Sequence, residues 1–391
     1  MSDHIPFEIQ TEIIKNLPVE SLIRFRSVSK SWKSLIDSSE FIVNYHVNCS
    51  QLQHNLFVRY IDAQELYEWN LEDENYLSIV DDDSFPQNWF PLIVPNSVKQ
   101  LGRLPLLLGT SQGLFSFYNN PVGSNRYKEM TVVIWNPTID KSVSVVVPNV
   151  LRNHPFQTVV GFGVCPRTMD PMLVKITYIY SLAYDMSICI PSQVEIFTLS
   201  SGAWRSSYNN MPRKSLTLTR NQVNIDGFIY WLATDRIPRG DGYYLNNSIL
   251  SFDMISEEFA DIHLPDSLAQ LSGSNLYIRK LRNSLVMLEI NREVEKQEHC
   301  VWRMVNGAPN SFEKLFIIKA PDASLIKKID GVLGFRKTGK PIIEVLYDSD
   351  ERNALFVYEP DLEHIDDIGI YGVGFPYLAT SYVETLLLLN H

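Results

Sequence analysis

The sequence predicts an α+β protein of two domains, a small three-helix domain followed by an all-β propeller of about six blades, with five to seven blades allowed. Two observations lead to this prediction. Apolar residues recur with a helical period within residues 1–45. From Leu56 onward, short β-branched and aromatic runs alternate with turn residues, which is the pattern of strands at frequent spacing.

The three helices are predicted from proline breaks, one N-cap and three apolar stripes. Pro6 suits the start of a first helix, and Pro18 both ends that helix and starts the second. Ser29 is a candidate N-cap for the third. The stripes consist of Ile9, Ile13, Ile14 and Leu17, then Leu22, Phe25 and Val28, then Trp32, Leu35 and Ile36.

A helical domain of this size buries little apolar surface within itself and rarely stabilises itself. Burying about six such side chains on a partner would contribute roughly 10 kcal/mol before the cost of association is subtracted. We therefore expect a protein partner, and an ordinary helical cap on the following domain is the alternative. A helix-turn-helix is disfavoured because 34 basic and 45 acidic residues give a formal net charge of −11. The same charge argues against anionic membranes.

The N-terminal residues resemble an F-box: Ile5-Pro6, then EIIKNLPVESLIRFRSVSKSWKSLI, then Phe41 and His46. Ile5 replaces the usual leucine, and Ser27 and Ser29 stand where many plant members have cysteine, but the stripes are unaffected. The resemblance implies binding to a Skp-type adaptor and, through it, to a cullin–RING ubiquitin ligase. The docking residues expected from it are Ile5, Pro6, Ile9, Ile13, Leu17, Pro18, Leu22, Phe25, Val28, Trp32, Leu35 and Ile36.

Beyond a predicted linker at residues 46–55, residues 56–391 repeat one unit in which an apolar strand, a polar turn and a second strand follow one another. The turns are marked by Asn70, Asn136, Ser200, Asp253, Asn306 and Glu359, at gaps of 66, 64, 53, 53 and 53 residues. A four-stranded propeller blade occupies about 40–50 residues, so the repeat predicts blades that stack around an axis. A last strand at residues 381–389 is expected to complete the blade that begins near Leu56, which would close the ring.

Two motifs in this region resemble the plant F-box-associated, kelch-like domain: GTSQGLFSFYN and VVIWNPTIDKSVSVVVP. Phe162-Gly163 and a later strand with Gly227, Tyr230 and Trp231 follow in the order of that family. The double-glycine kelch signature is absent. The resemblance implies that the propeller carries the surface that recognises a target.

No stretch of the sequence predicts catalysis, a metal site or a cofactor. Gly109-Thr-Ser111-Gln-Gly113 matches a nucleophile elbow, but a strand follows where the elbow needs a helix, so we interpret it as a tight β-turn. Asp81–Asp83 lacks the alternating ligands of a calcium loop and is expected to be an exposed acidic loop. The eight histidines and four cysteines form no local metal motif. The loop aromatics Trp69, Trp89 and Tyr243 are candidates for anchoring a partner.

These observations favour a non-catalytic substrate-recognition subunit of an SCF-type (Skp–cullin–F-box) ubiquitin ligase, which tethers a target protein for ubiquitination. The alternatives are a propeller enzyme with a helical N-terminal extension and an adaptor-bound scaffold without ligase function. The N-terminus lacks a signal-peptide pattern and no apolar run approaches 18–20 residues, so we expect a cytoplasmic or nuclear protein without membrane or nucleic-acid partners. The sequence does not identify the target or the loops that bind it.

Overall fold

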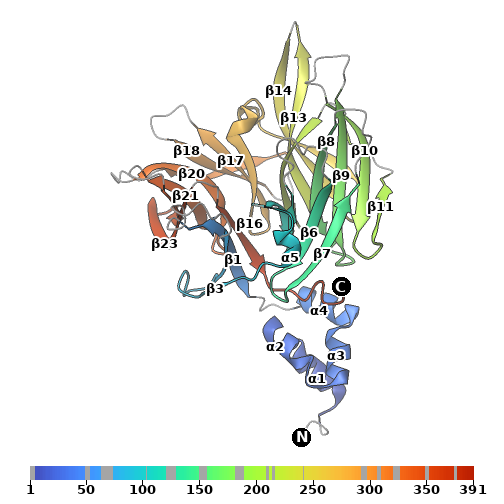
Figure 1. Ribbon diagram of the computed structural model, residues 1–391. Helices are drawn as coiled ribbons and strands as arrows, with labels where there is room; N and C mark the ends of the chain where they lie inside the picture. The colour runs from blue at the N-terminus through green and yellow to red at the C-terminus, as the bar shows by residue number, and fades with distance from the viewer. Residues whose placement is uncertain are drawn as a thin grey trace. The chain divides into compact units, whose positions relative to one another are not determined.

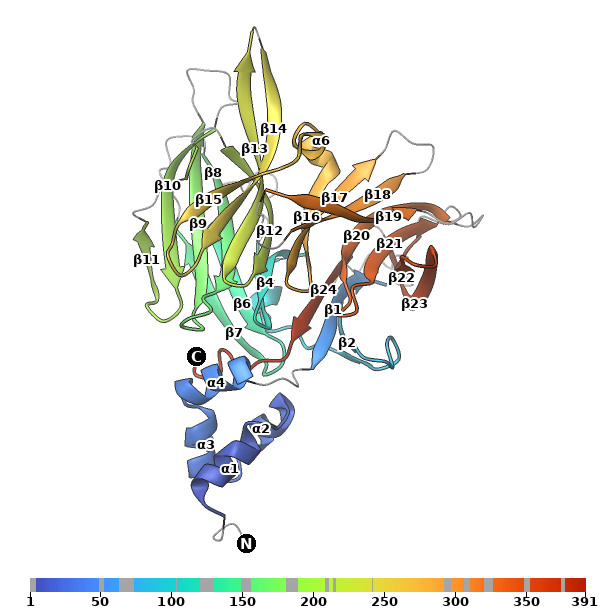
Figure 2. The same cartoon turned by 180° about the vertical axis from the view of Figure 1, so that it is seen from behind.

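A computed structural model shows α-helices near the N-terminus and β-sheets in the rest of the chain (Figures 1 and 2). It describes residues 5–48, 53–62, 74–102, 104–119, 129–148, 156–180, 189–207, 211–213, 216–240, 242–291, 297–305, 310–319, 326–347, 352–373 and 377–391. The chain divides into two compact units. One comprises Met1–Asn55, Ser78–Pro148 and Tyr382–His391, and the other comprises Leu56–Leu77 and Asn149–Ser381.

The helical domain contains four helices instead of the predicted three: α1 (Phe7–Ile14), α2 (Val19–Phe25), α3 (Lys30–Ile36) and α4 (Ser39–Asn48). The fourth forms because Ser38 Oγ accepts a hydrogen bond from Phe41 N at 3.2 Å, and because Phe41, Ile42 and Tyr45 recur at helical spacing and are buried. Residues 46–48, predicted as linker, are therefore helical, and the next strand begins at His54.

The remaining described residues form six four-stranded antiparallel sheets, the blades of a six-bladed β-propeller. Five sheets have their strands in chain order, and the sixth has the order β24-β1-β2-β3. The strands are β1 (His54–Ile61), β2 (Glu74–Val80), β3 (Trp89–Pro91), β4 (Leu106–Ser111), β5 (Leu114–Tyr118), β6 (Met130–Asn136), β7 (Lys141–Val147), β8 (Phe156–Val164), β9 (Pro171–Tyr180), β10 (Cys189–Thr198), β11 (Ala203–Ser206), β12 (Leu216–Ile225), β13 (Phe228–Arg239), β14 (Gly242–Asp253), β15 (Phe259–His263), β16 (Leu276–Leu281), β17 (Ser284–Asn291), β18 (Glu298–Met304), β19 (Phe312–Lys319), β20 (Ile326–Phe335), β21 (Pro341–Tyr347), β22 (Arg352–Glu359), β23 (His364–Val373) and β24 (Leu378–Val383).

Short helical segments interrupt the blades at α5 (Asn96–Lys99), α6 (Asp266–Ala269) and the 3₁₀ turn η4 (Gly273–Asn275). The repeated turn of the sequence corresponds to the connection between the third and fourth strand of a blade. Its polar residue closes an Asx turn: Asn136 Oδ1 accepts from Thr138 N at 2.9 Å, and Asp253 Oδ1 accepts from Ile255 N at 2.7 Å. This local bond explains why an Asn or Asp recurs at that position.

The first mark of the repeat was placed one strand too early. Asn70 and Asn306 both lie outside the described residues. In the sequence, Asn70 precedes β2. The turn equivalent to the others follows the end of β2 at Val80 and leads to β3. The sequence pattern places the turn mark at Asn70 because the polar residues there also separate two apolar runs.

The sheet order β24-β1-β2-β3 joins the C-terminal strand to the first strand of the propeller. The C-terminal strand is Leu378–Val383, however, and residues 384–389 of the predicted strand lie outside the sheet. Four consecutive leucines explain the difference, because a strand would expose every second side chain. A turn with a bond from Leu389 N to the Leu386 carbonyl at 3.1 Å instead buries all four.

Two residues of the first compact unit hold this C-terminal segment. Asn136 Nδ2 donates to the carbonyl oxygens of Thr385 at 2.9 Å and Leu387 at 2.7 Å. Gly113, with a φ of 80°, leaves no room for a side chain, because a Cβ there would lie 2.3 Å from the Val383 carbonyl oxygen. Two sequence motifs of the propeller thus anchor the end of the chain.

Candidate functional site

The helical domain presents an apolar stripe that the rest of the domain does not cover. Ile9 and Ile13 are four residues apart in α1, so they lie on successive turns of one face, and Ile5 lies two residues before the helix begins. The side chains of Ile5, Ile9 and Ile13 are 44%, 51% and 52% exposed, and Phe7, in the first turn of α1 and two turns before Ile14, is 46% exposed. We call Ile5, Phe7, Ile9 and Ile13 the α1 stripe. Contiguous apolar exposure of this kind marks a protein interaction site.

The opposite side of α1 faces the core of the domain through Ile14, which is 1% exposed. This core divides the predicted docking residues into three groups. Leu22 and Ile36 are fully buried and belong to it, whereas Leu17, Phe25, Trp32 and Leu35 are half-buried. The remaining six are exposed: Ile5, Pro6, Ile9, Ile13, Pro18 and Val28.

Hydrogen bonds between helices fix the orientation of the stripe. Trp32 Nε1 in α3 donates to Gln10 Oε1 in α1 at 2.9 Å. Tyr45 Oη in α4 donates to the Leu17 carbonyl at 2.9 Å, just beyond the end of α1. α1 is thereby held at two points, and the side chains on its outer face are preorganised for a partner.

Local bonds also define α3. Ser29 Oγ accepts from Trp32 N at 3.1 Å, which confirms the predicted N-cap. Arg26 forms a two-point ion pair with Asp37, with Nε–Oδ1 at 2.6 Å and Nη2–Oδ2 at 3.0 Å. Within the helical domain as described, Lys30 and Lys33 have no ion-pair partner, so α3 presents two cations that suit an acidic partner.

Phe7 is the member of the stripe that the sequence reasoning missed. The stripe predicted from the sequence consists of Ile9, Ile13, Ile14 and Leu17, and Phe7 precedes it. Two features pointed to it. It is aromatic, and it occupies the first helical position after Pro6.

The other candidates have structural roles. Ser111 ends β4 and pairs with Leu114 across a two-residue turn in which Gln112 and Gly113 both have positive φ, so the predicted β-turn is confirmed.

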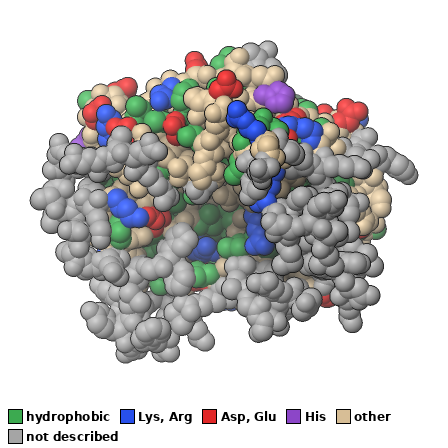
Figure 3. Space-filling view, turned by 90° about the horizontal axis from the view of Figure 1, so that it is seen from above, with side chains coloured by type: hydrophobic (Ala, Val, Ile, Leu, Met, Phe, Trp, Pro, Cys, Tyr) green, Lys and Arg blue, Asp and Glu red, His purple; other side chains and the backbone are tan. Residues whose placement is uncertain are grey.

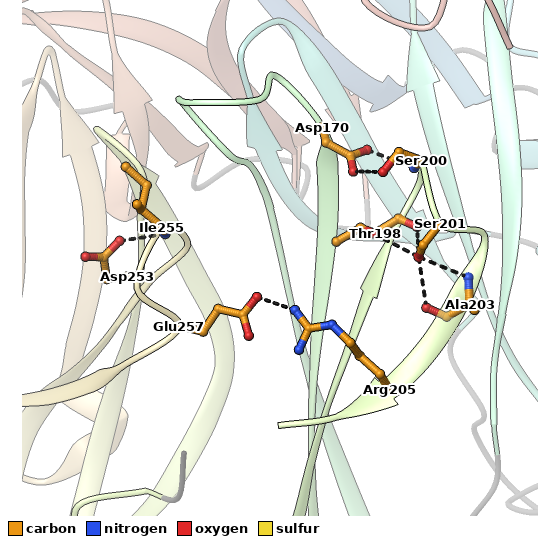
Figure 4. Close-up of polar contacts among 9 residues, drawn as sticks. All are labelled: Asp170, Thr198, Ser200, Ser201, Ala203, Arg205, Asp253, Ile255 and Glu257. Atoms are coloured by element: carbon orange, nitrogen blue, oxygen red, sulfur yellow. Dashed lines mark hydrogen bonds and ion pairs between the residues drawn. The ribbon is translucent and has the colours of Figure 1, made fainter. Parts of the chain in front are cut away.

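Asp170 accepts from Ser200 N at 3.0 Å, and Arg205 forms an ion pair with Glu257 (Figure 4). These polar groups close and connect turns of two blades. Among the described residues, no cluster of His, Cys, Asp and Glu could hold a metal ion.

Burial shifts the pKa of two ionisable groups at the end of β24, Tyr382 and Glu384, in the first compact unit. It raises the pKa of Tyr382 to about 12, although Tyr382 Oη shares a 2.8 Å hydrogen bond with Ser78 Oγ. Burial also raises the pKa of Glu384. Both shifts come from packing at the closing strand.

The face shown in Figure 3 carries acidic and basic side chains that are interspersed among apolar ones. Of the candidate loop aromatics, Trp89 is 59% exposed, while Trp69 and the side chain of Tyr243 lie outside the described residues. No helix in the described part of the chain is long and apolar enough to span a membrane.

Comparison with protein families agrees with this architecture. The F-box domain matches residues 2–44, and the F-box associated beta propeller domain matches residues 124–387. The chain belongs to the plant F-box proteins. This F-box protein is similar to the Arabidopsis thaliana F-box protein At3g10430, with 23% identity over 84% of this chain and 80% of the relative. It is also similar to F-box protein At3g23960 of the same plant, with 24% identity over 99% of this chain and 93% of the relative.

Solved structures similar to this F-box protein include the β-propeller domain of the trilobed protease from Pyrococcus furiosus. The identity is 12%, the TM-score is 0.35, and the match covers 67% of this chain and 81% of that one. A likeness at this level says nothing about activity. The α1 stripe lies inside the residues that match the F-box, so the exposed apolar surface and the family assignment coincide.

Proposed function

We propose that this F-box protein is the substrate-recognition subunit of an SCF-type ubiquitin ligase. Its helical domain docks on a Skp-type adaptor through the α1 stripe, and its propeller holds a target protein. The chain itself performs no chemistry. Tethering raises the effective concentration of the target's lysines near the charged conjugating enzyme. The observation that carries this proposal is the exposure of Ile5, Phe7, Ile9 and Ile13 on a helix that is otherwise held firmly in place.

The energetics suit a docking role. Burying an exposed apolar side chain of this size contributes about 1.5–3 kcal/mol, so the half-exposed members of the stripe supply several kcal/mol together. The two uncompensated lysines of α3, Lys30 and Lys33, add attraction for an acidic adaptor and increase the association rate. Protein interfaces usually have an apolar centre and a polar rim. In this domain, the α1 stripe supplies the apolar part and the two lysines supply the polar part.

The sharpest test replaces Ile9 and Ile13 together by aspartate in the full-length protein. Both side chains are about half exposed, so we expect the thermal unfolding curve to change little and co-purification with a Skp-type adaptor to be lost. Ile255→Asp is the matched control, because Ile255 is an exposed isoleucine on the propeller and its replacement should leave adaptor binding intact. Retained adaptor binding in the double variant contradicts the proposal.

Replacement of Leu17 and Pro18 is a less specific test. The Leu17 carbonyl accepts the Tyr45 hydroxyl, so changes there disturb helix packing as well as the surface. Leu22→Ala is useful as the opposite control. It is fully buried, and its loss should lower stability and adaptor binding together.

Ligase function needs a separate experiment. The complex of this F-box protein with the adaptor, a cullin and a RING subunit is reconstituted with a target captured by the propeller, and ubiquitin transfer is measured. We expect transfer to require the intact α1 stripe, with the complex acting in the cytoplasm or nucleus. A stable complex that binds target but transfers no ubiquitin would identify a scaffold instead.

A further inference from the structure

β3 is the edge strand of its sheet, and it exposes apolar side chains to solvent. Trp89 is 59% exposed, Phe90 is 41% exposed and Ile93, just after the strand, is 80% exposed. Pro91 between them is exposed as well. We call Trp89, Phe90, Pro91 and Ile93 the β3 patch. Proteins usually protect edge strands with charged side chains, so aromatic exposure here calls for a partner.

The sequence around the β3 patch is acidic and contains no base. Residues 60–98 include nine Asp or Glu and no Lys, Arg or His. Asp82 and Asp83 are exposed in the turn that leads to β3. Within the described residues, Asp83 forms no ion pair. A cation is therefore the missing complement of this surface.

The geometry of the turn is fixed locally. Asp82 Oδ1 accepts from Ser84 N at 2.8 Å, and Asn88 Nδ2 donates to Ser84 Oγ at 2.8 Å. Val80 N donates to the Asn88 carbonyl at 2.8 Å, which ties the far side of the turn to β2. The carboxylates and the aromatic edge therefore keep a constant spacing, and the surface is preorganised.

We propose that the β3 patch and Asp82–Asp83 bind a Lys- or Arg-rich segment of a partner protein. The exposed Trp89 indole offers its face to a cation. The aliphatic stems of Lys or Arg lie along Phe90 and Ile93, while their charged ends reach the two carboxylates. The proposal is independent of the adaptor-docking function, because it uses residues 82–93 instead of the helical domain.

Other occupants fit this surface less well. A second copy of the chain carries a formal net charge of −11, and nucleic acid is also anionic, so both are repelled by the acidic turn. A strand that pairs with the backbone of β3 is disfavoured because Pro91 has no N–H to donate. Docking through side chains of a basic segment is the mode that remains.

The test uses the full-length protein and a fluorescein-labelled synthetic peptide in which lysine alternates with serine and leucine. A second peptide with glutamate in place of lysine is the charge control. We expect the anisotropy to rise with the lysine peptide only. Trp89→Ala should weaken binding about tenfold, and Asp82→Asn with Asp83→Asn should weaken it by a similar factor at low salt.

Two matched controls separate this surface from general effects. Leu362 is 76% exposed in the turn between β22 and β23, and Leu362→Ala should leave peptide binding unchanged. Asp366→Asn removes an exposed acid from β23 and should also have no effect. Thermal unfolding of the Trp89→Ala variant reports that the propeller remains folded.

Several results would overturn the proposal. They are equal binding of the glutamate peptide, unchanged affinity in the folded Trp89→Ala variant, or absence of binding up to about millimolar peptide. A dimer in sedimentation experiments that Trp89→Ala dissociates would assign the β3 patch to self-association instead.

Discussion

Ile9 and Ile13 in α1 are about half exposed, whereas Trp135 in β6 and Trp231 in β13 are 1% and 0% exposed. The helical domain and the propeller thus use their large apolar residues for different purposes. In the propeller, large side chains such as Trp135 and Trp231 are buried, and their burial stabilises the fold. In α1, polar bonds at Gln10 and Leu17 hold the helix, which leaves its apolar face for a partner. Burial therefore separates residues that make the fold from residues that stay accessible to a partner.

The largest expected effect comes from the C-terminal segment. Deleting residues 384–391 removes four buried leucines, each of which contributes about 1.5–3 kcal/mol. It also leaves Asn136 Nδ2 without its two carbonyl partners. Since a domain is stable by only about 5–15 kcal/mol, we expect this truncation to yield no folded propeller in thermal unfolding experiments.

The control for this truncation removes only Asn390 and His391, which are exposed, and it should unfold like the intact chain. Cooperative unfolding of the longer truncation at an unchanged temperature would show that the leucines do not hold the ring closed. The helical domain offers a further comparison, because deletion of residues 1–6 removes Ile5 and Pro6, which are both exposed, and should cost little stability.

A smaller effect is expected for Trp231→Ala in the propeller. Trp231 packs against Gly161, where a Cβ would lie 2.3 Å from the indole Cζ2, so the site is shaped for this side chain. Removing a buried tryptophan costs about 3–5 kcal/mol. Urea unfolding should show this loss, while the folded fraction keeps its affinity for the adaptor. Loss of adaptor affinity in folded protein would break the separation between the two domains.

A buried carboxyl group gives the propeller a pH dependence. Glu344 is 2% exposed, and its Oε1 accepts from Asn353 Nδ2 at 2.5 Å. Burial raises the pKa of Glu344 from 4.5 to about 7, nearby Asp330 adds to the increase, and the bond from Asn353 opposes it. Because the folded pKa lies above the unfolded one, this group's contribution is complete below about pH 4.5 and is lost as the pH rises to about 7.

The expected loss between pH 4.5 and pH 7 is about 3 kcal/mol. Glu344→Gln keeps an acceptor for Asn353 but does not ionise, so its stability should depend less on pH. The quantity to measure is the difference in urea-unfolding free energy between the two proteins at pH 5 and at pH 8. A difference that does not change between these two pH values would contradict the assignment.

Much of this architecture could be predicted from the sequence because its signals are local. Proline breaks and apolar spacing locate α1 to α3, and the Asx residues at Asn136 and Asp253 mark turns that recur once per blade. The six-bladed fold follows from that repeat. The fate of residues 384–389 could not be predicted, because it depends on Asn136 and Gly113, which are distant in sequence.

The sequence predicts the docking residues only as a set and does not separate those in the core from those on the surface. Nine of the twelve predicted docking residues lie in the three apolar stripes, and a period does not distinguish the face toward the core from the face toward solvent. That distinction requires the helix packing. With α1 packed so that Trp32 bonds to Gln10, Ile14 is buried and Ile13 is half exposed, although they are adjacent in the sequence.

The smallest effect on stability is expected for Phe7→Ser, and it sharpens the comparison most. Phe7 is 46% exposed and its side chain makes no cap hydrogen bond, and such a surface substitution usually changes stability by no more than about 0.5 kcal/mol. If the α1 stripe docks on the adaptor, the same change removes a large apolar contact and should weaken adaptor binding about tenfold or more. Titration calorimetry with the purified adaptor measures this affinity. Phe7→Leu keeps an apolar side chain at that position and should recover most of the affinity. This recovery is not expected if Phe7 acts only in helix formation.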